Sequence, residues 1–275
     1  MSCSSKIVVF DLDETLGYFM ELGMFWDALK AYIKHKKLEI MADQLLFKQV
    51  LDLYPEFLRP NITGILNYIK KKKEQNHCDK LMIYTNNQGP SEWAKYIIGY
   101  FEEKVGHKVF DQIIGAFKVQ GKRVELCRTS QLKTHSDFVR CTKIPENTQI
   151  CFLDDVFYPD MSNDRIYYIN VRPYIHDLEF DDMISRCSNT DILTNNINEF
   201  DSEYFKQFMK SFLSRYNYIY VKKTDDSQLI DGIISKKIME HLRAFFKIRH
   251  IGPNPKNTKK RGSKNNNKTL KKRSI

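Results

Sequence analysis

Three short apolar runs in this chain stop abruptly at acidic or hydroxyl side chains. The runs, each with the side chains that follow it, are 7–10 with Asp11 and Asp13, 81–84 with Thr85, and 150–153 with Asp154 and Asp155. None of the runs has a helical period, and each is only a few residues long. Such runs are typical of strands that are buried on both faces of a parallel sheet.

Segments with helical character lie between these runs. Helices are expected over residues 24–54, 62–73, 91–103, 133–141, 201–216 and 226–247, and further strands within 111–117 and over 165–169. The alternation predicts an α/β fold, in which a parallel sheet carries helices on both faces. Ligands bind such sheets at the carboxyl ends of the strands, where the strand order reverses. The acidic and hydroxyl residues are therefore expected to meet there.

The 275 residues are enough for one large domain with an insertion and an appendage. Residues 1–198 are predicted to form the core, and residues 20–56 a small helical cap inserted into it. Residues 199–251 are expected to be appended helices. Residues 252–275 begin with Gly-Pro-Asn-Pro, are rich in Lys and Asn, and are predicted to be a disordered basic tail.

The net charge of +10 belongs mostly to that tail. Residues 252–275 contain nine Lys and Arg residues and no acidic residue, so residues 1–251 carry a net charge of only +1. The folded part is therefore nearly neutral and need not bind polyanions. The positive charges at 256–273 suit contact with nucleic acid, a nuclear-localisation signal, or simply a solubilising end.

Cysteine spacing and hydropathy favour an intracellular protein, in the cytoplasm or the nucleus. No pair of cysteines has C-x-x-C spacing, none has a His at zinc-finger spacing, and no secretory signal is visible. All six are expected to be reduced thiols: Cys3, Cys78, Cys127, Cys141, Cys151 and Cys187. No apolar run approaches about 18 residues, so neither a membrane-spanning helix nor a membrane partner is expected.

The paired acids suggest a metal site. Two carboxylates one residue apart can share a hard cation and still have different roles. The side chain of Asp11 can point at the ligand, while Asp13 offers its backbone carbonyl to the metal and keeps its carboxyl for proton transfer. Asp154 and Asp155 from a neighbouring strand would complete an oxygen-rich site, which suits Mg²⁺.

These residues give the chain a resemblance to the haloacid dehalogenase (HAD) superfamily of aspartate-nucleophile phosphohydrolases. The resemblance covers roughly residues 5–175 and lies in residues 7–16, residues 81–86, a lysine before the last strand, and residues 150–155. It implies a HAD-like Rossmannoid parallel sheet. It also implies a phosphatase with Mg²⁺ as cofactor.

One branch of that superfamily is most similar. The sequence Asp-Leu-Asp-Glu-Thr-Leu at 11–16, with Phe-Leu-Arg-Pro at 57–60 entering a helix, resembles the phosphatases of the RNA polymerase II C-terminal domain. Asn61 after Arg-Pro departs from that branch, where Gly or His is usual. The helical insertion also departs from it, because that branch carries a short β insert.

The resemblance implies a role for each residue. Asp11 would be the nucleophile that forms an aspartyl-phosphate, and Asp13 the acid and base. Thr85, with Asn86 beside it, would bind the phosphoryl group, and a lysine would balance its charge. Metal ligands would be Asp11, Asp13 and Asp155, with Asp154 orienting the lysine or a metal-bound water.

The lysine is the role with most candidates. Lys133 begins a predicted helix 21 residues before Asp154, a spacing that the superfamily tolerates. Lys143 is closer but adjoins a probable loop, and Lys118 and Lys122 are also available. Lys133 is the preferred assignment for both catalysis and substrate binding.

Three functions follow from these patterns. The leading hypothesis is a Mg²⁺-dependent phosphatase acting on a phosphorylated protein. The second is a phosphatase of small molecules, nucleotides or nucleic-acid ends that uses the same site. The third is a binding protein that keeps the fold and uses its basic tail for interaction; the four intact carboxylates argue against it.

Overall fold

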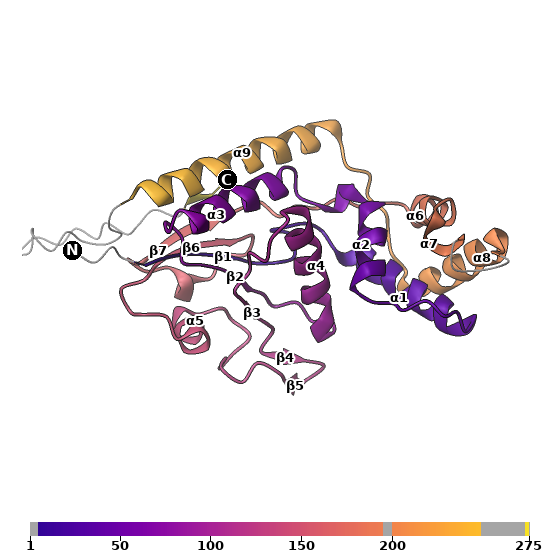
Figure 1. Ribbon diagram of the computed structural model, residues 1–275, viewed down its shortest axis with the longest axis horizontal. Coiled ribbons are helices and arrows are strands. Elements are labelled where there is room, and N and C mark those ends of the chain that lie inside the picture. The colour runs from indigo at the N-terminus through magenta and orange to yellow at the C-terminus, as the bar shows by residue number, and fades with distance from the viewer. Residues whose placement is uncertain (1–4, 195–199, 249–272, 275) are drawn as a thin grey trace, which may run out of the picture.

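The computed structural model describes residues 5–194, 200–248 and 273–274 (Figure 1). Five parallel strands form the central sheet in the order β3-β2-β1-β6-β7. They are β1 (Lys6–Phe10), β2 (Lys80–Tyr84), β3 (Gln112–Ile114), β6 (Gln149–Asp154) and β7 (Ile166–Asn170). The two-residue β8 (Arg273–Ser274) pairs with β7, and β4 (Lys118–Val119) and β5 (Lys122–Arg123) form a separate hairpin. The predicted α/β fold with a parallel sheet is confirmed.

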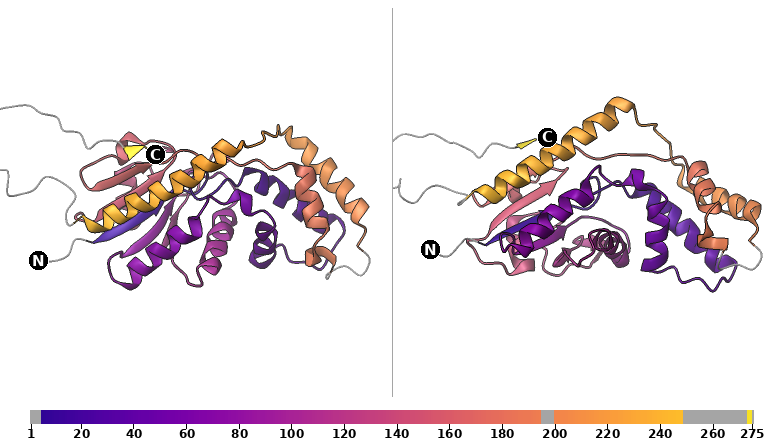
Figure 2. Two further views of the ribbon diagram at one scale, coloured as in Figure 1. Left: turned by 90° about the horizontal axis from the view of Figure 1, so that it is seen from above. Right: turned by 45° about the horizontal axis from the view of Figure 1, so that its top comes forward.

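Helices cover both faces of the sheet because side chains along a strand alternate between its faces. The helices are α3 (Ile62–Glu74), α4 (Ser91–Lys104), α5 (His135–Thr142) and α9 (Asp225–Lys247), with the short η2 (Pro159–Met161). Val8 and Phe10 belong to the same apolar core as α3, α4 and α9. Ile7 and Val9 face the other way, towards Phe138 of α5. Figure 2 shows α9 and α3 lying along one face.

A second group of helices lies at one end of the molecule and comes from two distant parts of the chain (Figures 1 and 2). We call it the helical lobe. It comprises α1 (Met20–His35), α2 (Gln44–Asp52), η1 (Pro55–Phe57), α6 (Phe180–Ser188), α7 (Asp191–Thr194) and α8 (Ser202–Leu213). Tyr32 of α1 packs edge-on against Phe205 and Phe208 of α8, with ring centroids 4.9 and 5.5 Å away. The predicted insertion is therefore covered by helices from the C-terminal part.

The helical segment expected over 24–54 consists of two helices, α1 and α2, with a break between them. The chain leaves α1 at Lys36 and passes through Lys37 with a φ of 52°. It re-enters helix at α2, where the Asp43 carboxylate accepts hydrogen bonds from the backbone N–H of Leu45 and Leu46. An Asp at the N-cap satisfies N–H groups that have no partner within the helix, so it marks a new helix start.

The helices expected over 201–216 and 226–247 are present but lie apart. The first is α8, followed by the short η3 (Ser214–Tyr216), and it belongs to the helical lobe. The second is α9, which packs on the sheet. Most of the predicted basic tail, residues 252–272 and 275, lies outside the described residues. Within the described ranges, no helix has the length and hydropathy needed to cross a membrane.

The expectation that all six cysteines are reduced is wrong for two of them. Cys127 and Cys141 form a disulfide, with Cα atoms 5.0 Å apart. The bond joins the loop before α5 to the last turn of that helix. The 14-residue spacing gave no sign of it, because the fold of the intervening loop brings the two thiols together. Cys78, Cys151 and Cys187 are buried free thiols, and Cys3 lies outside the described residues.

A buried carboxyl ties the helical lobe to the segment before α9. Glu21, in the first turn of α1, is fully buried and accepts a hydrogen bond from the Tyr218 hydroxyl. Its Oε2 has no partner among the described residues, and Asp177 lies nearby, accepting from the backbone N–H of Val221 at 2.9 Å. Burial raises the pKa of Glu21 to about 7, and Asp177 adds to the increase.

We expect Glu21→Gln to change how stability depends on pH. A folded protein in which an acid has a raised pKa binds an extra proton between the two pKa values, so its free energy of unfolding falls as pH rises through that window. For Glu21 the window runs from 4.5 to about 7. Urea unfolding at pH 5 and pH 8 should show a pH effect about 3 kcal/mol smaller in the variant than in the wild type. The same substitution at the exposed Glu39 should leave the effect unchanged; equal pH effects in all three proteins would contradict the assignment.

Candidate active site

The polar residues that follow β1, β2 and β6 meet at the carboxyl edge of the sheet. β1 pairs with β2 on one side and β6 on the other, so the strand order reverses between β1 and β6. Ligands bind α/β sheets at such a point. A cavity of about 210 Å³ lies there. All seven residues predicted for the site line it: Asp11, Asp13, Thr85, Asn86, Lys133, Asp154 and Asp155.

Lys133 links two of the carboxylates. It lies just before α5, and only 1% of it is exposed. Its ammonium group donates to Asp11 and, at 2.7 Å, to Oδ2 of Asp154. Burial by itself lowers the pKa of an ammonium group, but the charges of Asp11 and Asp154 outweigh it and raise the pKa of Lys133. Lys133 is therefore positively charged beside Asp11.

The other lysine candidates lie elsewhere. Lys118 and Lys122 belong to the β4–β5 hairpin, and Lys143 directly follows α5. None of the three is among the residues that line the cavity. The expected helix over 133–141 begins two residues late, at His135, because the Thr134 hydroxyl accepts from the backbone N–H of Asp137 and caps it.

Three carboxylates face one another across the cavity. One oxygen each from Asp11, Asp154 and Asp155 lies within 4.8 Å of the others. Both oxygens of Asp154 already accept hydrogen bonds, from Lys133 and from the backbone N–H of Val156 at 2.9 Å. Burial, followed by the charge of Asp11, raises the pKa of Asp155. One ammonium group does not balance three carboxylates, and the surplus charge on an all-oxygen donor set fits Mg²⁺.

Asp13 is placed for proton transfer. Its Oδ2 accepts from the Asn87 side chain at 2.7 Å. Burial, and then the charge of Asp11, raise the pKa of Asp13 to about 7, while the Asn87 hydrogen bond acts in the opposite direction. A carboxyl with this pKa can both give and take a proton near neutral pH.

Thr85 and Asn86 are held by the turn after β2. The hydroxyl oxygen of Thr85 accepts from the backbone N–H of Asn87 at 3.0 Å, which leaves its proton able to donate. The Asn86 side chain donates to the Tyr158 hydroxyl at 3.0 Å. Arg128, fully buried, donates to the carbonyl oxygens of Thr85 and Gly115 at 3.1 and 2.7 Å. It thus fixes the ends of β2 and β3 together.

Arg59 holds the turn after β1. It is buried, and it donates to the carbonyl oxygens of Thr15, Glu14 and Arg172 at 2.6, 2.6 and 2.9 Å. Glu14 has a φ of 57°, a left-handed conformation that is uncommon for residues other than glycine. Three charge-assisted hydrogen bonds offset the cost of that conformation and keep Asp11 and Asp13 in place.

Sequence reasoning missed several supporting residues. Asn87, Glu14 and Tyr158 also line the cavity, and Arg59 and Arg128 hold its loops. Of these residues, only Arg59 had a signal in the sequence, namely the Arg-Pro pair before α3. That pair indicated a family resemblance, but it did not indicate the contact with the turn after β1. Arg128 bonds to carbonyl oxygens distant in sequence, which no local pattern reveals.

The chain was compared with protein-family models, with curated proteins and with solved structures, and no match was found in any of the three comparisons.

Proposed function

We propose that this protein is a Mg²⁺-dependent phosphatase in which Asp11 attacks a phosphomonoester. The observation that carries the proposal is the placement of Lys133, charged and buried, between Asp11 and Asp154 in the cavity that Asp13, Thr85 and Asp155 also line. A nucleophilic carboxylate, an acid and a fixed cation are the groups that phosphoryl transfer requires.

In the first half of the reaction a carboxylate oxygen of Asp11 bonds to phosphorus, and the bond to the leaving oxygen breaks. Lys133 balances the negative charge of the transferring oxygens, and the Thr85 hydroxyl donates to one of them. Protonated Asp13 gives its proton to the leaving oxygen, so the alcohol departs neutral. The raised pKa of Asp13 supports this role, because it keeps the carboxyl partly protonated near neutral pH.

In the second half, water attacks the phosphorus of the aspartyl-phosphate on Asp11. Asp13, now ionised, takes a proton from that water, so the acid of the first step becomes the base of the second. Inorganic phosphate leaves, and Asp11 and Asp13 return to their starting states. The Asn87 hydrogen bond holds Asp13 in one orientation through both steps.

Asp11 and Asp155 are the side chains proposed to hold Mg²⁺, with the backbone carbonyl of Asp13 as a further ligand. Bound there, the cation would supply charge neutralisation for the phosphoryl oxygens. Asp154 keeps the position of Lys133, because its two oxygens are used by Lys133 and the backbone N–H of Val156.

Placement in the HAD superfamily is part of the same proposal. The reversal of strand order between β1 and β6, with Asp11 and Asp154 at the ends of those strands, supports it. A phosphorylated protein is the proposed substrate, and a small phosphorylated molecule the alternative. Both present the same phosphoryl group to Asp11.

The test is hydrolysis of p-nitrophenyl phosphate with Mg²⁺ and after chelation by EDTA. Turnover should stop on chelation and return with added Mg²⁺. We expect Asp155→Asn to raise the Mg²⁺ concentration for half-maximal activity by about tenfold or more, because it removes a charged ligand. The matched control is Asp164→Asn, the same change at an exposed residue, which should keep the wild-type Mg²⁺ requirement. Turnover that is unaffected by chelation would contradict the metal assignment.

A further inference from the structure

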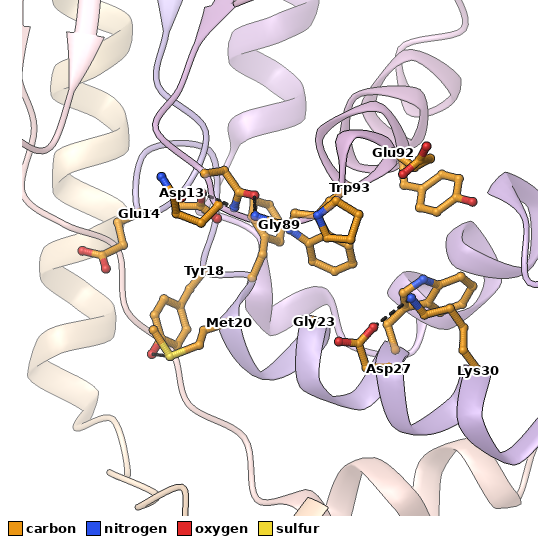
Figure 3. A pocket seen from close by; sticks show the side chains of 16 residues that line it. Asp13, Glu14, Tyr18, Met20, Gly23, Asp27, Lys30, Gly89, Glu92 and Trp93 are labelled. Atoms are coloured by element: carbon orange, nitrogen blue, oxygen red, sulfur yellow. Dashed lines mark hydrogen bonds and ion pairs between the residues drawn. The ribbon is translucent and has the colours of Figure 1, made fainter. Parts of the chain in front are cut away.

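A second and larger cavity, of about 640 Å³, opens beside the candidate active site. Asp13, Glu14 and Asn87 line both cavities, so the two adjoin at these residues. Figure 3 shows Asp13 and Glu14 at one end of the larger cavity and Trp93 and Lys30 towards the other. Its size is within the range of about 300–1,000 Å³ that is usual for small-molecule pockets.

The walls of this cavity are aromatic. They come from α1 of the helical lobe and from the start of α4. Trp26 and Trp93 are the only tryptophans of the chain, and both are almost completely buried, with 2% and 8% exposed. Tyr18, Phe19 and Tyr96 complete the aromatic lining. Gly23 leaves room in front of Trp93, because a Cβ at this position would meet the Trp93 ring at 3.5 Å.

The charge of the cavity is negative. Asp13, Glu14, Asp27 and Glu92 all line it. Among the lining residues, all of which are described, Lys30 is the single cation, and it forms an ion pair with Asp27 at 2.8 Å. A second phosphate on the substrate would meet no unpaired cation, and the unpaired acids Glu14 and Glu92 would repel it. A neutral or positively charged group is favoured.

We propose that this cavity binds the leaving group of the substrate, and that the substrate is a phosphomonoester with one phosphate on a neutral or cationic aromatic group. The inference rests on the proposed function. Asp13, Glu14 and Asn87 line both the active-site cavity and the aromatic cavity, so the group attached to the leaving oxygen extends towards Trp93. A flat ring can pack against the aromatic side chains that line the cavity. Tyrosyl phosphate in a peptide and a nucleoside monophosphate share this chemistry; nucleic-acid ends and bisphosphates do not, because they carry further phosphates.

Binding can be measured without turnover. Because both tryptophans line the cavity, intrinsic tryptophan fluorescence reports on it alone. In an Asp11→Asn background, phenyl phosphate should change the emission at a concentration at least about tenfold lower than glycerol phosphate does. Equal concentrations for the two would overturn the proposal. A tyrosine-phosphorylated peptide and a nucleoside 5′-monophosphate, titrated in parallel, identify which source of the ring is preferred.

A filled cavity provides the second test. Gly23→Leu places a side chain in front of Trp93, and leucine has a higher helix propensity than glycine within α1; circular dichroism checks that the variant is folded. We expect kcat/KM for phenyl phosphate, relative to that for acetyl phosphate, to fall about tenfold or more. The matched control is Gly232→Leu in α9, where a Cβ would meet nothing within 4 Å, and the ratio should stay at the wild-type value.

The outcomes separate this inference from the proposed function. If the wild type hydrolyses acetyl phosphate with Mg²⁺ but shows no preference for the aromatic ester, or if Gly23→Leu leaves the ratio unchanged, the leaving-group site is wrong and the phosphatase proposal stands. A preference for a nucleoside 3′,5′-bisphosphate over the monophosphate would also overturn the inference. If the wild type hydrolyses neither acetyl phosphate nor any of these phosphate esters, both proposals fail.

Discussion

Replacing Asp11 with Asn is expected to reduce the hydrolysis of p-nitrophenyl phosphate by about 1,000-fold or more. The amide has the shape of the carboxylate but cannot form the acyl-phosphate bond, so the proposed two-step route is closed. The residue is almost buried at the end of β1 and receives a hydrogen bond from Lys133. The measurement is steady-state kinetics with saturating Mg²⁺, with circular dichroism to show that the variant is folded.

The matched control is Asp160→Asn, which makes the same chemical change at an exposed residue of η2. It should retain wild-type kinetics. Comparable turnover by Asp11→Asn and the wild type would show that Asp11 is not the nucleophile. Loss of activity in both variants would indicate a general loss of fold, which the circular dichroism spectra would reveal.

Lys133→Met should lose both activity and stability. Without the ammonium group the transferring phosphoryl oxygens lose a fixed positive charge, which we expect to cost about 100-fold or more in kcat. The same change leaves Asp11 and Asp154 close together without their shared cation. Removing one partner of a buried ion pair typically costs about 3–5 kcal/mol, so urea unfolding should show a loss of this order.

A double variant separates the two effects. Lys133→Met with Asp154→Asn removes one of the stranded charges, so it should recover part of the lost unfolding free energy while kcat stays low. Recovery of kcat together with stability would show that Lys133 acts only by maintaining the structure. The single variant Asp154→Asn is the reference for the double variant, because Lys133 keeps its ion pair with Asp11 in it.

The strand ends could be predicted because their signals are local. Each apolar run is long enough for one buried strand, and the residue that ends it is polar, so Asp11, Thr85 and Asp154 were assigned without knowledge of the fold. Parallel pairing of the strands then brings them to one edge. The choice of Lys133 came from the resemblance to the superfamily, which tolerates a lysine 21 residues before Asp154.

What could not be predicted depends on contacts between distant parts of the chain. Arg59 and Arg128 donate hydrogen bonds to backbone carbonyl oxygens. Every residue has such an oxygen, so the sequence does not indicate which ones are bound. The disulfide between Cys127 and Cys141 depends on the path of an irregular loop. The packing of α8 on α1, which joins residues 20–57 with 180–194 and 200–213 in one group of helices, is a further contact of this kind.

The two-part construction of the helical lobe has a consequence for biosynthesis. The apolar face of α1, which includes Tyr32, leaves the ribosome well before its partner Phe205 on α8. At a synthesis rate of about 5–20 residues per second, the gap is roughly 9–35 s. During that time the sheet strands up to β7 can already pair, while α1 still lacks its cover. The nascent chain therefore carries an exposed aromatic surface on α1 that suits recognition by chaperones until α8 has been made.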